Sequence, residues 1–139
     1  MLKRIMCFGD SNTWAFKPGS FDPKTTLGKR YNENERWTYL LSKALPNWVV
    51  IEEGLNGRTT MFDDLKAGKP YRNGLAHLPM CLETHYPLDL VLFMLGSNDL
   101  RACSRSIIDA MISAYKNLRR ILKCANPIPV TSAVRHLKK

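Results

Sequence analysis

The sequence lacks any apolar run long enough to cross a membrane, and its first residues do not resemble a secretory signal. The opening residues MLKRIMCF carry basic side chains, but their apolar run is far shorter than the hydrophobic region of a signal peptide. No later stretch approaches the roughly 20 apolar residues of a membrane span. We therefore expect a cytoplasmic protein that has no membrane partner.

Cysteine is also scarce, and no two cysteines form a C-x-x-C pair. The 4 cysteines are scattered along the chain: Cys7, Cys81, Cys103 and Cys124. This scatter argues against a zinc site or a redox motif and favours free thiols in a reducing compartment. A chain of 139 residues can bury a core without such cross-links, so we predict one domain.

Acidic residues are fewer than basic ones, and the formal net charge is +9. A basic balance can indicate nucleic-acid binding. Here, however, Lys and Arg are spread over the whole length, without a tight block, and no zinc-finger, RNA-recognition or basic-zipper signature accompanies them. A solvated basic surface explains the charge, and we expect no specific nucleic-acid partner.

Strand and helix patterns alternate along the chain. Apolar segments at 4–8, 48–53 and 88–95 predict buried strands, and the last is nearly continuous in apolar residues. Helical spacing of apolar residues predicts helices within 35–45, 74–86 and 106–124. This order predicts an α/β fold with a parallel sheet and right-handed crossovers.

The end of the chain departs from this pattern. After the helix at 106–124, residues 127–139 have little apolar continuity and end in positive charge, so we predict no fourth strand there. A sheet of three strands would leave an exposed apolar edge. We interpret residues 1–126 as the N-terminal part of a single domain, truncated after the third strand and its helix, and 127–139 as an atypical basic tail.

Each predicted strand is followed by a segment that begins with glycine and continues with small polar residues. These segments are GDSNTW, GLNGRTT and GSNDL. Gly, Asn, Asp and Ser are common in turns, so one such segment alone would be weak evidence. In a parallel sheet, however, the carboxyl ends of the strands lie at one edge, where ligands bind. Three equivalent segments there predict a functional site.

These three blocks together resemble the SGNH hydrolases, also called the GDSL esterase/lipase family. The similarity is closest to the branch of small arylesterases and acyltransferases and extends from Lys3 to Asn126. It implies a three-layer α/β/α sandwich of the flavodoxin-like, SGNH-hydrolase type. It also implies that Ser11 is the nucleophile of an acyl-enzyme mechanism, with Gly57 and Asn98 in the oxyanion hole. Fixed donors of this kind stabilise the negative charge of the tetrahedral stage.

The resemblance further implies a small carboxylic ester as substrate, no metal and no organic cofactor. It points to a homo-oligomer and to acyl transfer to alcohols. We assign Asp10, Asn12 and Trp14 to the substrate-binding surroundings of Ser11. Trp14 would line the acyl pocket, while Asp10, adjacent to Ser11, would brace the turn. Residues Arg58 to Thr60 would hold the second loop in shape.

The base that activates the serine is not evident in the sequence. The family supplies it from a D-x-x-H block near the C-terminus, and no aspartate here has histidine three residues later. His77 lies in a predicted helix, His85 precedes the third strand, and His136 has Ala133 in the place of the acid. Two interpretations stay open: an incomplete esterase, or an inactive relative that binds an acyl ligand or a protein partner.

Overall fold

The computed structural model describes residues 2–25, 28–63 and 70–101, together with 113, 116, 120 and 130–132. Within these residues one sheet is formed by parallel strands in the order β2-β1-β3-β4. The strands are β1 (Lys3–Gly9), β2 (Trp48–Gly54), β3 (Leu90–Met94) and β4 (Val130–Ser132). The predicted α/β fold with a parallel sheet is confirmed.

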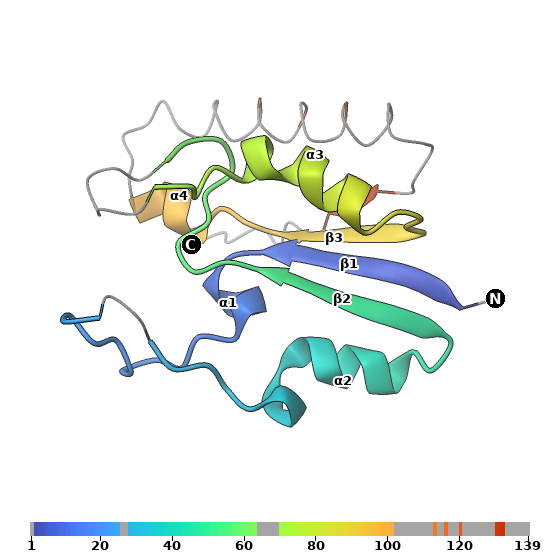
Figure 1. Ribbon diagram of the computed structural model, residues 1–139, viewed down its shortest axis with the longest axis horizontal. Helices are drawn as coiled ribbons and strands as arrows, with labels where there is room; N and C mark the ends of the chain where they lie inside the picture. Colours follow the sequence, from blue (N-terminus) through green and yellow to red (C-terminus); the bar gives the residue numbers. More distant parts are fainter. Residues whose placement is uncertain are drawn as a thin grey trace, which may run out of the picture.

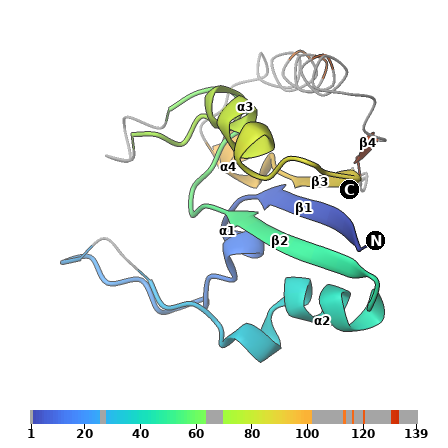
Figure 2. The same cartoon turned by 45° about the vertical axis from the view of Figure 1, so that its right-hand side comes forward.

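Helices connect the strands and cover both faces of the sheet, as Figures 1 and 2 show for α2 below and α3 above. The sandwich therefore has three layers, as predicted. Most of the helix that we predicted at 106–124 lies outside the described residues, as does His136. The helical elements are α1 (Ser11–Trp14), the 3-10 turn η1 (Glu33–Glu35), α2 (Trp37–Ala44), α3 (Gly74–Thr84) and α4 (Ser97–Arg101).

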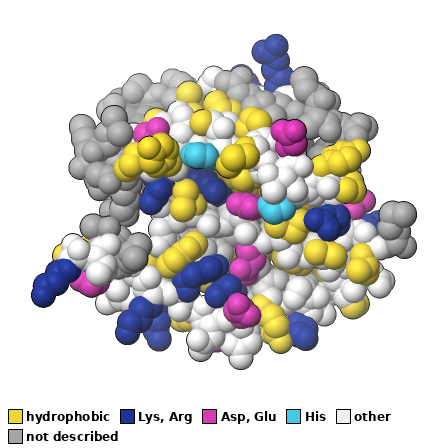
Figure 3. All heavy atoms as spheres, viewed as in Figure 1, with side chains coloured by type: hydrophobic (Ala, Val, Ile, Leu, Met, Phe, Trp, Pro, Cys, Tyr) yellow, Lys and Arg dark blue, Asp and Glu magenta, His cyan; other side chains and the backbone are white. Residues whose placement is uncertain are grey.

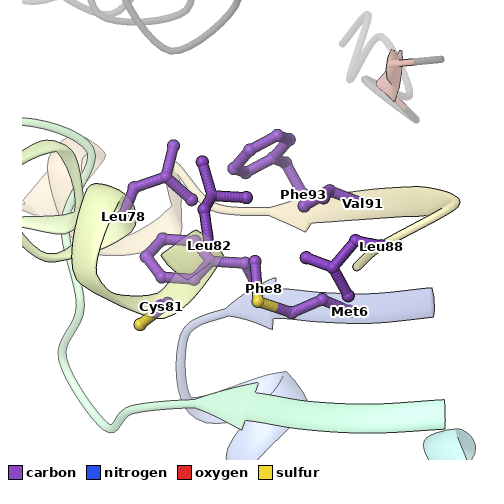
Figure 4. Packing of buried hydrophobic residues seen from close by; sticks show 8 residues of the cluster. All are labelled: Met6, Phe8, Leu78, Cys81, Leu82, Leu88, Val91 and Phe93. Atoms are coloured by element: carbon purple, nitrogen blue, oxygen red, sulfur yellow. The ribbon is translucent and has the colours of Figure 1, made fainter. Parts of the chain in front are cut away.

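The main core lies between α3 and the sheet (Figure 4). Alternate residues of a strand face opposite sides, so Met6 and Phe8 of β1 meet α3 while Ile5 and Cys7 face the other layer. Phe8 packs edge-on against Phe93 of β3, with ring centroids 5.8 Å apart. This core packs β1 and β3, the strands that precede the first and third glycine-led loops, against α3. Its buried members are Met6, Phe8, Leu78, Cys81, Leu82, Leu88, Val91 and Phe93.

β2 is an edge strand, and this corrects the prediction that 48–53 is a buried strand. All its residues are only partly buried, because β2 has a neighbouring strand, β1, along one edge only. Charged side chains on such an edge discourage pairing with other chains. Glu52 pairs with Arg36 (3.0 Å) and Arg30 (3.4 Å), and Glu53 pairs with His85. Figure 3 shows acidic and basic side chains interspersed on this face of the molecule.

The short strand β4 is a second correction. Val130–Ser132 pairs in parallel with β3, within the segment that we predicted to be a tail without a strand. Three residues are too few to produce a recognisable apolar pattern, so the pairing was not visible in the sequence. β3 is therefore an interior strand of the sheet.

Candidate active site

The carboxyl ends of β1, β2 and β3 lie side by side. In the strand register Gly9 is opposite Gly54 on one side and Met94 on the other. The three glycine-led loops thus leave the sheet at one edge, as predicted. Ser11, Gly57 and Asn98 each come from a different one of these loops.

Hydrogen bonds tie the first loop to its two neighbours. The backbone N–H of Asp10 donates to the carbonyl of Met94 (3.2 Å), and that of Leu55 donates to the carbonyl of Gly9 (3.1 Å). The Gly9 carbonyl also accepts a bond from the Arg58 guanidinium (3.1 Å). The end of β1 is consequently fixed relative to both loops that would complete an oxyanion hole.

Ser11 is the first residue of α1 and is partly exposed, and Asp10 caps this short helix. One carboxylate oxygen of Asp10 accepts from the backbone N–H (2.9 Å) and the side-chain amide (3.1 Å) of Asn12. Asp10 is 0% exposed, and burial raises the pKa of its carboxyl group although the Asn12 bonds oppose the shift. Its carboxylate therefore braces the turn, and its inaccessibility argues against direct contact with a substrate.

Gly57 lies in a tight turn of the second loop. The backbone N–H of Arg58 donates to the carbonyl of Leu55 (3.0 Å), Gly57 has φ 77°, and Asn56 does not have a positive φ. These features define a type II turn with Gly57 at the position that requires positive φ. Glycine adopts this conformation without strain, which explains its presence there.

Asn98 of α4 contacts the second loop through its side chain. Its amide donates to the carbonyl of Arg58 (3.0 Å). An amide NH2 has two N–H donors, and this bond uses one of them. The contact joins the third loop to the turn that contains Gly57, so both candidate donors belong to one hydrogen-bonded unit.

Two further buried groups stabilise this unit. Asp99, which is 0% exposed, accepts from the backbone N–H (2.9 Å) and the hydroxyl (2.5 Å) of Thr60. The Arg58 guanidinium lies 4.0 Å from the Phe8 ring centroid, and burial lowers its pKa. The expected role of Arg58 and Thr60 in shaping the loop agrees with these bonds. Sequence reasoning missed Asp99, although its position directly after Asn98 was a signal.

Trp14 lies where the long polar segment 17–34 returns to α1. The Arg30 guanidinium stacks on the Trp14 ring at 4.9 Å and donates to the Trp14 carbonyl (2.7 Å). The backbone N–H of Tyr31 also donates to the Ala15 carbonyl (2.8 Å). Trp14 is partly buried and Asn12 is exposed. The segment is thus attached to the element that carries Ser11.

The two described histidines contribute to α3. His77 lies within this helix, and His85 follows its last residue and bonds to Glu53 through a 2.6 Å contact. The contact fastens the end of α3 to β2, which agrees with a structural role for His85. In the described residues, no cluster of three or more His, Cys, Asp or Glu side chains has the arrangement of a metal site.

The comparisons with known proteins place the chain in a family. The model of the GDSL-like Lipase/Acylhydrolase family matches residues 7–135. The chain belongs to this family. This confirms the family predicted from the three blocks. A search of curated protein sequences returned no match.

Solved structures of this family's fold align with the chain. The aryl esterase of M. smegmatis is 37% identical over 94% of this chain, with a TM-score of 0.76. A carbohydrate acetylesterase family member from Sinorhizobium meliloti is 39% identical over 88% of it, with a TM-score of 0.71. The chain spans 62% of the first protein and 54% of the second.

Among the residues that the structure describes, no helix has the length and apolar character needed to cross a membrane.

Proposed function

We propose that the site around Ser11 cleaves small carboxylic esters through an acyl-enzyme intermediate. The observation that carries the proposal is the bond from the Asn98 amide to the Arg58 carbonyl, which joins Asn98 to the turn that contains Gly57. The strands that lead to these two residues end on either side of the strand that leads to Ser11. The family's lipase and acylhydrolase chemistry and the aryl esterase and acetylesterase neighbours support it.

In the proposed reaction, the hydroxyl oxygen of Ser11 attacks the ester carbonyl carbon. The serine proton passes to a base, and negative charge develops on the carbonyl oxygen. The backbone N–H groups of Ser11 and Gly57 and the second amide N–H of Asn98 would stabilise this charge. The C–O bond to the alcohol then breaks, and the base returns the proton to the alcohol oxygen. Water, with its proton taken by the same base, then attacks the acyl-serine; the acid is released and the proton restores the Ser11 hydroxyl.

The base is the missing component. No D-x-x-H occurs in the 139 residues, and the hydroxyl of serine is a weak nucleophile without an adjacent base. Imidazole added to the assay can take this role, so the nucleophile and the oxyanion hole can be tested separately from the base.

The test is hydrolysis of p-nitrophenyl acetate by the purified chain and by Ser11→Ala, at increasing imidazole concentrations. Imidazole also hydrolyses the ester in free solution, so a protein-free series is subtracted. We expect a protein-dependent rate that increases with imidazole and disappears in Ser11→Ala. Equal rates for the two folded proteins would contradict the esterase proposal and favour the alternative of an inactive relative that binds an acyl ligand or a partner.

A further inference from the structure

Arg72 lies next to the turn that contains Gly57, although it belongs to a different segment of the chain. Its guanidinium Nε donates to the carbonyl of Asn56 (2.7 Å), and its Nη1 donates to the carbonyl of Pro70 (2.9 Å). The side chain is partly buried. No motif in the sequence points to a role for Arg72.

The Asn56 carbonyl belongs to the same peptide unit as the Gly57 N–H. This peptide unit is trans and planar, so its C=O and N–H point in opposite directions within the plane. Arg72 donates a hydrogen bond to the C=O of this unit. The N–H of Gly57 is therefore directed to the side away from Arg72.

The orientation of this one peptide distinguishes two common turns. Type I and type II turns differ mainly by a flip of the central peptide, and the φ of 77° at Gly57 selects type II. In the other orientation the Gly57 N–H would exchange sides with the Asn56 carbonyl. A hydrogen bond from a charged donor is stronger than one from a neutral donor, so Arg72 favours the observed orientation.

Arg72 is itself held in place by the same loop. Its carbonyl accepts from the backbone N–H (2.9 Å) and the hydroxyl (3.2 Å) of Thr59. Its own N–H donates to the Asp63 carboxylate (2.6 Å). The arginine backbone is thus anchored to one side of the loop while its side chain reaches the turn.

We propose that Arg72 is a positioning residue for the oxyanion hole, because it locks the Asn56–Gly57 peptide with the Gly57 N–H toward the site. This inference rests on the proposed function. Arg72 touches no reacting atom and acts through Gly57. The charged bond also polarises the peptide, which makes its N–H a better donor.

The chemical test is the reaction of Ser11 with a p-nitrophenyl alkylphosphonate in the presence of imidazole. The Ser11 Oγ–P bond forms, the P–O bond to p-nitrophenolate breaks, imidazole takes the serine proton, and the adduct places an anionic oxygen in the hole. We expect Arg72→Met to slow Ser11-dependent labelling at least about tenfold, since a small misplacement of a catalytic group can cost about a hundredfold. Arg120→Met, at an exposed position, is the matched control and should label at the wild-type rate.

A second measurement is independent of the chemistry. The 15N–1H resonance of Gly57 should shift in Arg72→Met and stay in place in Arg120→Met. If Arg72→Met shows no cooperative thermal unfolding transition, it is not folded, and Arg72→Lys replaces it in both measurements. Lysine supplies one donor group in place of the guanidinium fork, so we expect an intermediate rate and a smaller shift.

An unchanged Gly57 resonance in a folded variant overturns the inference. So does an unchanged labelling rate when the wild-type protein reacts at Ser11. If the wild-type protein reacts no faster than Ser11→Ala, the proposed function fails instead, and the Gly57 resonance still decides whether Arg72 positions the turn.

Discussion

At the scale of single residues, Asp10 is a buried acid beside the candidate nucleophile. Burial raises its pKa above the ordinary value of 3.8 because the charged carboxylate loses solvent, while the Asn12 bonds act in the opposite direction. The native state therefore binds this proton more tightly than the unfolded chain does. The resulting stabilisation is present below the unfolded pKa and is lost as pH rises through the folded pKa.

Replacing Asp10 by asparagine should remove this pH dependence. The quantity to follow is the difference in the free energy of unfolding, wild type minus Asp10→Asn. We expect this difference to fall as pH rises from about 3.8 through the raised pKa, and then to level off. Urea unfolding of both proteins across this range measures the difference. A difference that rises with pH in this window would contradict the burial argument.

Asn98 offers a direct test of one oxyanion donor. Removing such a donor typically lowers kcat by about 10²–10³-fold. We expect Asn98→Ala to reduce the Ser11-dependent rate with imidazole by this order, with a much smaller change in KM. Asn47→Ala, an exposed asparagine at the opposite end of the strands, is the control. Equal losses in both variants would mean that Asn98 only supports the fold.

At the scale of elements, the end of β2 lies in close contact with the backbone of α1. A Cβ atom on Gly54 would lie 2.2 Å from the Trp14 nitrogen and 2.5 Å from the carbonyl carbon of Thr13. Both are backbone atoms, so neither can rotate away. The absence of a side chain at Gly54 therefore sets how closely the helix that begins at Ser11 approaches the sheet.

Gly54→Ala should displace α1 and damage both stability and chemistry. We expect a loss of about 1–3 kcal/mol in the free energy of unfolding, typical of overpacking, and a lower rate of Ser11 labelling. Gly19→Ala is the matched control: Gly19 has φ 74° and open space around it. The free energy of unfolding of Gly19→Ala should be about 1 kcal/mol lower because of backbone strain, and its labelling rate should equal that of the wild type. A Gly54→Ala protein that labels normally would show that α1 tolerates the displacement.

At the scale of the whole molecule, two thiols report on the integrity of the two layers. Cys7 faces one side of the sheet, and burial, with the charge of Glu52, raises its pKa to about 12. Cys81 lies on the α3 side, where burial and Glu53 raise its pKa to about 11. Thiolates are the reactive form, so both groups should be inert in the folded protein.

A protein that keeps only these two cysteines makes the expectation measurable. In Cys103→Ser/Cys124→Ser, a disulfide reagent at pH 8 should react with neither thiol until denaturant unfolds the chain. The reaction should then follow the unfolding curve measured by circular dichroism. Rapid reaction of Cys81 alone, before unfolding, would show that α3 separates from the sheet independently.

At the scale of the whole molecule, part of the sheet could be predicted from the sequence. The apolar runs around Ile5, Val50 and Val91 predicted three strands correctly, because strand formation depends on local pattern. The position of β2 at the sheet edge was missed, because apolar residues alone do not report how many neighbours a strand has. The pairing of Val130–Ser132 was missed because three residues carry too little pattern.

The sequence by itself determined the order of the elements and the identity of the three loops, because a glycine-led polar turn after an apolar run is a local property. The resemblance of these loops to the SGNH hydrolases pointed to Ser11, Gly57 and Asn98 as the candidate residues. Only the tertiary structure decided how these loops are held. The bond from Asn98 to Arg58 joins residues 40 apart in sequence, that from Thr60 to Asp99 joins residues 39 apart, and that from Arg72 to Asn56 joins residues 16 apart. Contacts over such separations depend on how the sheet brings its strand ends together, and no local periodicity records them.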